Sequence, residues 1–232
     1  MDIKRWICMI LIGCMFLTVG CQKVADETKD LEDVNIQEEE EEQTVGALTE
    51  VSYPRKLTQQ ELQDMTEWIR QNDNYGFLLS AYERPQEILW DEVFYNGAGL
   101  EMTALSEQER QKYLESNSQE EIYTDVNRLT KAQIEEFVLK KTGVSYEEME
   151  QPLSWVCLPK EEIYISEHGD TNYMYYTCVG GEQTDGEQYV LKCVPGDGEE
   201  DQSYYTPCEL TLKKSGEGYL FCANRFVEGF EQ

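Results

Sequence analysis

The residues best suited to chemistry lie in the stretch 167–172 (EHGDTN). His168 is the only histidine of the chain, and Asp170 and Asn172 follow it at alternate positions. An imidazole with a nearby carboxylate could act as a general base or as a metal ligand. Glycine, aspartate and asparagine also make ordinary turns, and the stretch falls between two predicted strands. We therefore expect a loop, favour a turn over a site, and keep His168, Asp170 and Asn172 as the best candidate for a functional loop.

No catalytic residue can be assigned around this loop. A nucleophilic serine would need a recognisable setting, such as the G-x-S-x-G turn that exposes it at the end of a strand. No serine or cysteine of the chain has a signature of this kind. The catalytic residues are therefore unknown, and the pattern predicts no cofactor.

Four cysteines of the C-terminal half recur at nearly equal spacing: Cys178, Cys193, Cys208 and Cys222. If each lies on a successive strand of a meander, each lies beside the next. A two-residue turn at Asp185-Gly186 would place Cys178 directly opposite Cys193, on the face towards the helices and the core. That register makes them a hydrogen-bonded pair, whose wider spacing suits a disulfide less well.

Several states of these thiols are open. Disulfides could join Cys178 to Cys193 and Cys208 to Cys222, or Cys193 to Cys208. Buried free thiols are equally favoured, because cysteine is among the most buried residue types. Cys157 is left over as a free thiol. Four residues on four strands span about 14 Å, whereas zinc needs every sulfur within about 2.3 Å, so we expect no metal site.

Cys21 belongs to a different pattern. Lys4 and Arg5 precede the apolar run 6–17, and Thr18-Val19-Gly20-Cys21 follows. A positive segment, an apolar run and small residues are the layout of a secretory signal peptide. With the cysteine, the segment resembles a bacterial lipoprotein signal, although that family usually has leucine where Thr18 stands. The resemblance implies cleavage before Cys21, lipid on its sulfur, and an extracytoplasmic protein anchored to the cell membrane.

Two other interpretations of this segment are open, an ordinary cleaved signal peptide and an uncleaved anchor. The anchor is the weakest, because the apolar run is shorter than the roughly 20 residues that cross a bilayer as a helix. We assign residues 1–21 to the signal, 22–50 to an acidic disordered tether and 51–232 to a single domain. The formal net charge of −28 argues against a nucleic-acid partner, which needs clustered lysine and arginine.

The domain must position its cysteines and histidine with helices first and strands last. Capping-box pairs predict three helix starts: Thr58 with Glu61, Ser106 with Glu109, and Thr130 with Gln133. Pro85 suits the first position of a further helix. After Pro159, β-favouring residues predict strands at 163–165, 172–179, 187–194, 204–213 and 218–226. This order predicts an α+β fold, with N-terminal helices packed on a C-terminal antiparallel β-meander of four to five strands.

Three stretches resemble segments of known proteins as a set: 74–80 (NYGFLLS), 91–97 (DEVFYNG) and 168–173 (HGDTNY). They are similar to segments of uncharacterised exported lipoproteins of Gram-positive gut anaerobes, over most of residues 55–230. The resemblance implies a Gram-positive cell surface. It carries no activity and therefore no catalytic residue.

The predicted function follows from an anchor and a tether without a recognisable reaction. We expect a non-enzymatic binding or interaction module, which recognises a cell-wall component, a peptide or a protein through its sheet face or the His168 loop. One alternative is an extracellular hydrolase that uses His168 and Asp170. Another is a cone-shaped domain of helix and curved sheet that holds a small apolar ligand.

Overall fold

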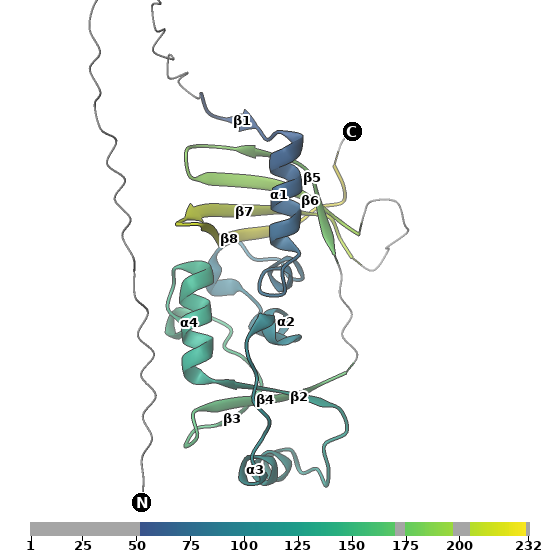
Figure 1. Cartoon of the computed structure of the whole chain (residues 1–232), viewed down its shortest axis with the longest axis vertical. Helices are drawn as coiled ribbons and strands as arrows, with labels where there is room; N and C mark the ends of the chain where they lie inside the picture. Colours follow the sequence, from purple (N-terminus) through teal and green to yellow (C-terminus); the bar gives the residue numbers. More distant parts are fainter. Residues whose placement is uncertain (1–51, 170–174, 197–204, 231–232) are drawn as a thin grey trace, which may run out of the picture. The chain divides into compact units, whose positions relative to one another are not determined.

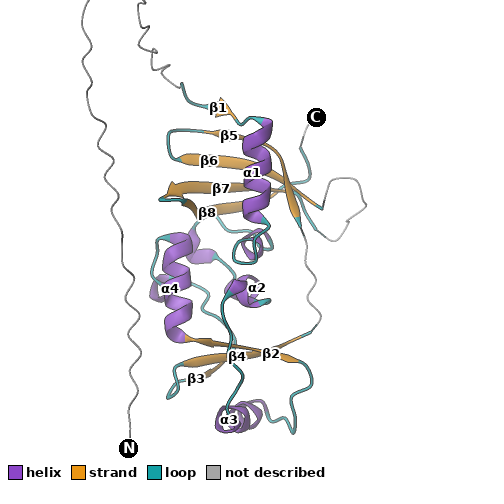
Figure 2. Cartoon of the chain, in the orientation of Figure 1, coloured by secondary structure: helices purple, strands orange, loops and turns teal. Residues whose placement is uncertain are grey.

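The computed structural model describes residues 52–169, 175–196 and 205–230 (Figure 1). The predicted signal, Cys21 and the predicted tether lie outside the described residues, as do Asp170 and Asn172. Within the described ranges, no helix has the length and apolar character needed to cross a bilayer. The fold is α+β, as predicted, but its strands form two antiparallel sheets (Figure 2).

The helices have the bounds α1 Gln59–Ile69, α2 Trp90–Phe94, α3 Glu107–Asn117 and α4 Lys131–Thr142. Helices α1, α3 and α4 begin where the capping residues predict. Short 3-10 segments occupy Tyr75–Leu78, Pro85–Glu87, Gly97–Gly99 and Tyr146–Glu148. Reciprocal capping boxes start α1, α3 and α4 at Thr58, Ser106 and Thr130. Local side-chain hydrogen bonds therefore fix these three starts.

The helix expected from Pro85 is interrupted. Pro85 does open a 3-10 turn, but Ile88 adopts an extended conformation with ψ of 132° before α2 begins at Trp90. Both Ile88 and Trp90 are almost completely buried. Packing of these two side chains into the core takes precedence here over continuation of a local helix.

The larger sheet has the strand order β1-β5-β6-β7-β8. Its strands are β1 Arg55–Lys56, β5 Tyr176–Gln183, β6 Gln188–Pro195, β7 Cys208–Ser215 and β8 Gly218–Phe226. The last four strands follow one another along the chain and pair antiparallel, which confirms the predicted meander. The two-residue strand β1 pairs with β5 at the edge.

A second sheet of order β2-β4-β3 was not predicted. It consists of β2 Asp125–Thr130, β3 Val156–Leu158 and β4 Ile163–His168. The expectation that residues 163–165 belong to one series with the later strands is therefore wrong. The sequence pattern did not predict β2, because most of its residues are polar. Its buried positions are Asn127 and Leu129. Its partner β4 lies far along the chain, and local pattern does not report such pairing.

The main core lies between the larger sheet and the helices. Helix α1 contacts β5, and α4 contacts both β8 and β2. Phe77 stacks on Phe221 with ring centroids 3.9 Å apart, and Leu191 and Leu210 are completely buried. We call the sheet face that carries these residues the inner face, and the opposite one the outer face. Packed side chains fill the inner face.

Candidate functional site

His168 is the last residue of strand β4, and not a loop residue as predicted. Its backbone pairs with Asp125 of β2. The ring Nδ1 lies 3.1 Å from the carbonyl oxygen of Gly169, and the ring centroid lies 6.0 Å from that of Tyr95. The turn-forming residues begin only after His168. Pairing with β2 extends the strand to His168, three residues beyond the predicted end at 165.

Asp125 is the carboxylate that the sheet brings opposite His168, and sequence reasoning missed it. Directly opposite residues share a face of the sheet, but these two are distant in sequence, and no local signal could have paired them. The neighbouring Glu167 accepts hydrogen bonds from the Tyr113 hydroxyl at 3.2 Å and the Tyr123 N–H at 2.9 Å. Glu167 therefore fastens surrounding segments to β4. The predicted partners Asp170 and Asn172 lie outside the described residues.

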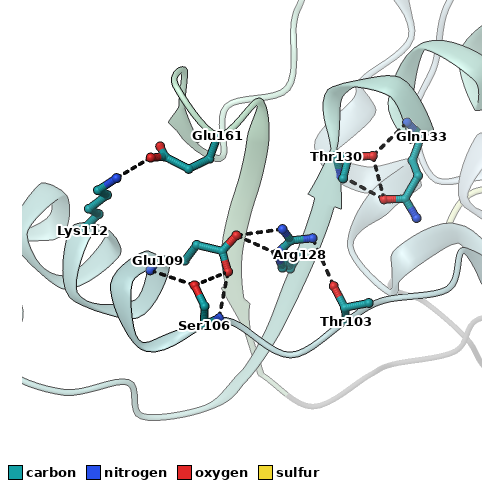
Figure 3. A network of polar contacts seen from close by, with 8 residues as sticks. All are labelled: Thr103, Ser106, Glu109, Lys112, Arg128, Thr130, Gln133 and Glu161. Carbon is teal, nitrogen blue, oxygen red and sulfur yellow. Dashed lines mark hydrogen bonds and ion pairs between the residues drawn. The ribbon is translucent and has the colours of Figure 1, made fainter. Parts of the chain in front are cut away.

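A polar network beside β4 joins the cap of α3 to strand β2 (Figure 3). Glu109 caps the N-terminus of α3 through Ser106 and receives the Arg128 guanidinium at 2.7 Å. Arg128 also donates to the Thr103 hydroxyl at 3.1 Å, and an ion pair joins Lys112 to Glu161. The Arg128 guanidinium and the cap lower the pKa of Glu109 to about 2. Each charge already has a protein partner, so we assign this network to structure.

Three buried thiols form a row across the inner face of the larger sheet. Cys178 of β5 lies directly opposite Cys193 of β6, which lies opposite Cys208 of β7. Their exposed fractions are 5%, 0% and 0%. The Sγ atoms of Cys178 and Cys193 are 3.8 Å apart. These three cysteines are free thiols in the structure, and so is the exposed Cys157.

Cys178 lies opposite Cys193, as the turn-based prediction has it, but the two form a non-hydrogen-bonded pair and not the predicted hydrogen-bonded one. Gln183 pairs with Tyr189, so the turn is longer than two residues, and a bulge between Cys178 and Gly180 restores the predicted register. The N–H of Cys178 donates to Thr66 Oγ1 at 3.0 Å and so points away from β6. The two cysteines are therefore a non-hydrogen-bonded pair, which has the closer spacing.

Cys222 does not belong to this row. The tight turn between β7 and β8 pairs Ser215 with Gly218, and a register shift between Thr211 and Leu212 adds one residue, so Phe226 lies opposite Cys208. The expectation that Cys208 lies beside Cys222 is therefore wrong. Cys222 is half-buried, and burial raises its pKa. Equal cysteine spacing reports neither the position of the turn nor the extra residue of a bulge.

The electrostatic setting differs between the two paired thiols. A hydrogen bond from Cys193 lowers the pKa of Cys178, with further help from the Thr66 hydroxyl and the Arg70 guanidinium. The same contact raises the pKa of Cys193, as do Cys208 and burial. Cys178 is therefore the thiol that loses its proton more readily. In the part of the chain that the structure describes, no group of three or more His, Cys, Asp and Glu could hold a metal ion.

An open groove of about 1010 Å³ lies over the outer face of the larger sheet. Its apolar floor includes Val179, Val190 and Val194. Val179 is the residue between the bulge positions of β5 and is 51% exposed. A bulge re-aims side chains and breaks the regular alternation of a strand. It here leaves an apolar side chain uncovered in the groove.

Charges of both signs surround this floor. Lys56, Lys192, Glu182 and Glu209 line the groove together with Phe230. The Lys192 ammonium lies 5.4 Å from the centroid of the Phe230 ring, so the C-terminal segment approaches the outer face at this point. An apolar floor with a few polar groups around it is the usual composition of a binding site. Sequence reasoning named the sheet face but none of these residues.

Comparisons with protein-family models, with curated proteins and with solved structures found no match for this chain. The resemblance of the stretches 74–80, 91–97 and 168–173 to exported lipoproteins therefore stays a prediction.

Proposed function

We propose that this chain is a surface lipoprotein, anchored to the cell membrane by lipid on Cys21, which presents a non-enzymatic binding module outside the cytoplasm. The order of positive residues, apolar run and Cys21 supports the anchor. The acidic segment 22–50, which has no aromatic residue, suits a spacer between the membrane and the module.

The observation that carries the binding function is the groove over the outer face. Its ligand is an extended peptide segment of a partner protein. Valine side chains on β5 and β6 offer apolar contacts along the sheet, and Lys192 and Glu209 offer one charge of each sign. A peptide with alternating apolar and charged residues matches both features. A nucleic acid does not, because the groove has no excess of positive charge.

Strand addition is a less suitable mode of peptide binding here. It requires unpaired backbone groups at a sheet edge. On β5, the carbonyl oxygen of Tyr176 accepts from Arg70, the N–H of Cys178 donates to Thr66, and the carbonyl oxygen of Gly181 accepts from Leu57. These three edge groups are already satisfied, so the peptide lies on the face of the sheet.

The experiment is a peptide-library selection on the full chain, followed by measurement of the affinity of the enriched peptides. The groove variant Val179→Glu with Val194→Glu should weaken binding at least tenfold. Lys214→Glu is the matched control, since Lys214 is an exposed residue of β7 that does not line the groove. Selection without enriched peptides, or peptides that bind the groove variant as tightly as the native chain, would contradict the proposal.

A further inference from the structure

We propose that Cys178 and Cys193 form a disulfide in the exported protein, whereas Cys208 stays a thiol. The starting observation is geometric: the two residues are directly opposite in the β5–β6 pair and their Sγ atoms are 3.8 Å apart. A disulfide bond is about 2.05 Å long. A small rotation of the two side chains therefore brings the sulfurs to bonding distance without a change of register.

The type of backbone pairing selects this disulfide over the alternative between Cys193 and Cys208. Cys178 donates its N–H to Thr66 and not to β6, which makes Cys178 and Cys193 a non-hydrogen-bonded pair. A strand residue directs its N–H and its C=O towards the same neighbouring strand. Cys193 does not direct them towards Cys178, so it directs them towards Cys208. Opposite Cα atoms are about 4.5 Å apart in a non-hydrogen-bonded pair and about 5.5 Å apart in a hydrogen-bonded pair. Cys193 is therefore nearer to Cys178.

Arg70, the residue that follows α1, lies beside the Cys178 strand once the helix has docked on β5. Arg70 donates to the carbonyl oxygen of Tyr176 at 3.1 Å and to the Thr177 hydroxyl at 2.6 Å. These two contacts hold a positive charge beside the strand that carries Cys178. A neighbouring cation stabilises a thiolate. Cys193 lies deeper and has no exposed surface.

The bond forms by two thiol–disulfide exchanges with a small-molecule or protein disulfide as oxidant. The Cys178 thiolate attacks one sulfur of the oxidant, forms a mixed disulfide and releases one thiolate. The Cys193 thiolate then attacks the Cys178 sulfur and releases the second. Two thiols of the chain are oxidised and one disulfide is reduced to two thiols. Both cysteines are buried in the folded chain, so the exchange takes place before α1 covers β5.

The test uses the full chain, purified without reductant from an exporting host. Free thiols are alkylated in denaturant, and peptides are mapped by mass spectrometry before and after reduction. Peptides that contain Cys178 and Cys193 should be linked, and Cys157, Cys208 and Cys222 should be alkylated. Alkylation of Cys178 and Cys193, or a link from Cys193 to Cys208, would overturn the proposal.

A second measurement separates this inference from the proposed export and peptide binding. The purified chain is unfolded, reduced and refolded in a glutathione buffer that contains oxidised glutathione. Cys208→Ser should still form the link, and Cys193→Ser should leave Cys178 free. Reduction of the linked native chain should lower the Tm by about 5–10 °C. A refolded chain without the link would reject the proposal, whatever the location or ligand of the protein.

Discussion

The Thr66 hydroxyl oxygen accepts the backbone N–H of Cys178 at 3.0 Å and thereby ties α1 to the edge of β5. The same hydroxyl donates to the carbonyl oxygen of Leu62 one turn earlier in α1, at 2.8 Å. Arg70, at the end of the helix, satisfies the carbonyl oxygen of Tyr176 on the same edge. An uncovered edge strand is a template for pairing with other chains. Helix α1 therefore protects β5 and also sets the type of pair that Cys178 makes with Cys193.

The Thr66 contact gives a prediction for stability. Thr66→Val keeps the shape of the side chain but leaves the buried N–H of Cys178 without its acceptor. The free energy of unfolding should fall by about 1–3 kcal/mol, as measured by urea denaturation under reducing conditions. Thr66→Ser is the control, because it retains the hydroxyl, and should lose less. Equal stability of Thr66→Val and the native chain would show that the bond contributes nothing.

A buried ammonium gives a second prediction. Lys141 is 6% exposed and donates to Asp73 and to the Asn74 side chain, both at 2.5 Å. Burial lowers its pKa. Asp73→Ala leaves this charge with less compensation and should lower the free energy of unfolding by about 2 kcal/mol.

The matched variants for this pair separate charge burial from packing. Lys141→Met removes the charge, keeps most of the side-chain volume, and should be neutral or slightly stabilising. Glu217→Ala, an exposed acid in the β7–β8 turn, should change stability little. Chemical denaturation at neutral pH measures all three variants. A Lys141→Met variant less stable than Asp73→Ala would show that the ion pair itself is strongly favourable.

Glu109 gives a prediction for pH dependence. Its pKa in the folded chain is about 2, below the ordinary value of 4.5, because Arg128 and the cap of α3 favour the carboxylate. A depressed pKa contributes stability above the unfolded pKa, and that contribution is lost as pH falls. The difference in unfolding free energy between the native chain and Glu109→Gln should therefore be largest above about pH 5 and shrink towards pH 2.

Unfolding curves at successive pH values measure this difference. Glu120→Gln is the matched control, since Glu120 is exposed and its replacement should change stability little. The effect should also persist in high salt better than that of an exposed ion pair, because Arg128 and Glu109 are only 17% and 13% exposed. A constant difference for Glu109→Gln from pH 7 to pH 2 would contradict the assignment.

The proposed anchor gives a prediction for location. Cys21→Ser removes the only sulfur that can carry the lipid at the predicted cleavage site, so the chain should move from the membrane fraction to the soluble fraction. Metabolic labelling with a radioactive fatty acid should mark the native chain and not the variant. Cys157→Ser, which changes an exposed cysteine of the domain, should keep both the label and the membrane fraction. Retention of the label by Cys21→Ser would reject the lipoprotein assignment.

Several features could be predicted because they depend on residues close in sequence. The capping boxes at Thr58, Ser106 and Thr130 fixed three helix starts, since each box needs residues only three positions apart. Turn residues and β-favouring runs likewise predicted the meander β5–β8, although the strand bounds differ by a few residues. The sheet face was named as a binding surface, but its groove residues were not.

By itself, the sequence determined the α+β class and the starts of α1, α3 and α4, because these depend on residues close in sequence. Only the tertiary structure decided that His168 ends a strand opposite Asp125 and that Phe226, not Cys222, lies opposite Cys208. Strand pairing joins distant residues, and the positions of turns and bulges together decide which neighbours meet. Both outcomes depend on how the whole core packs, which no local pattern reports.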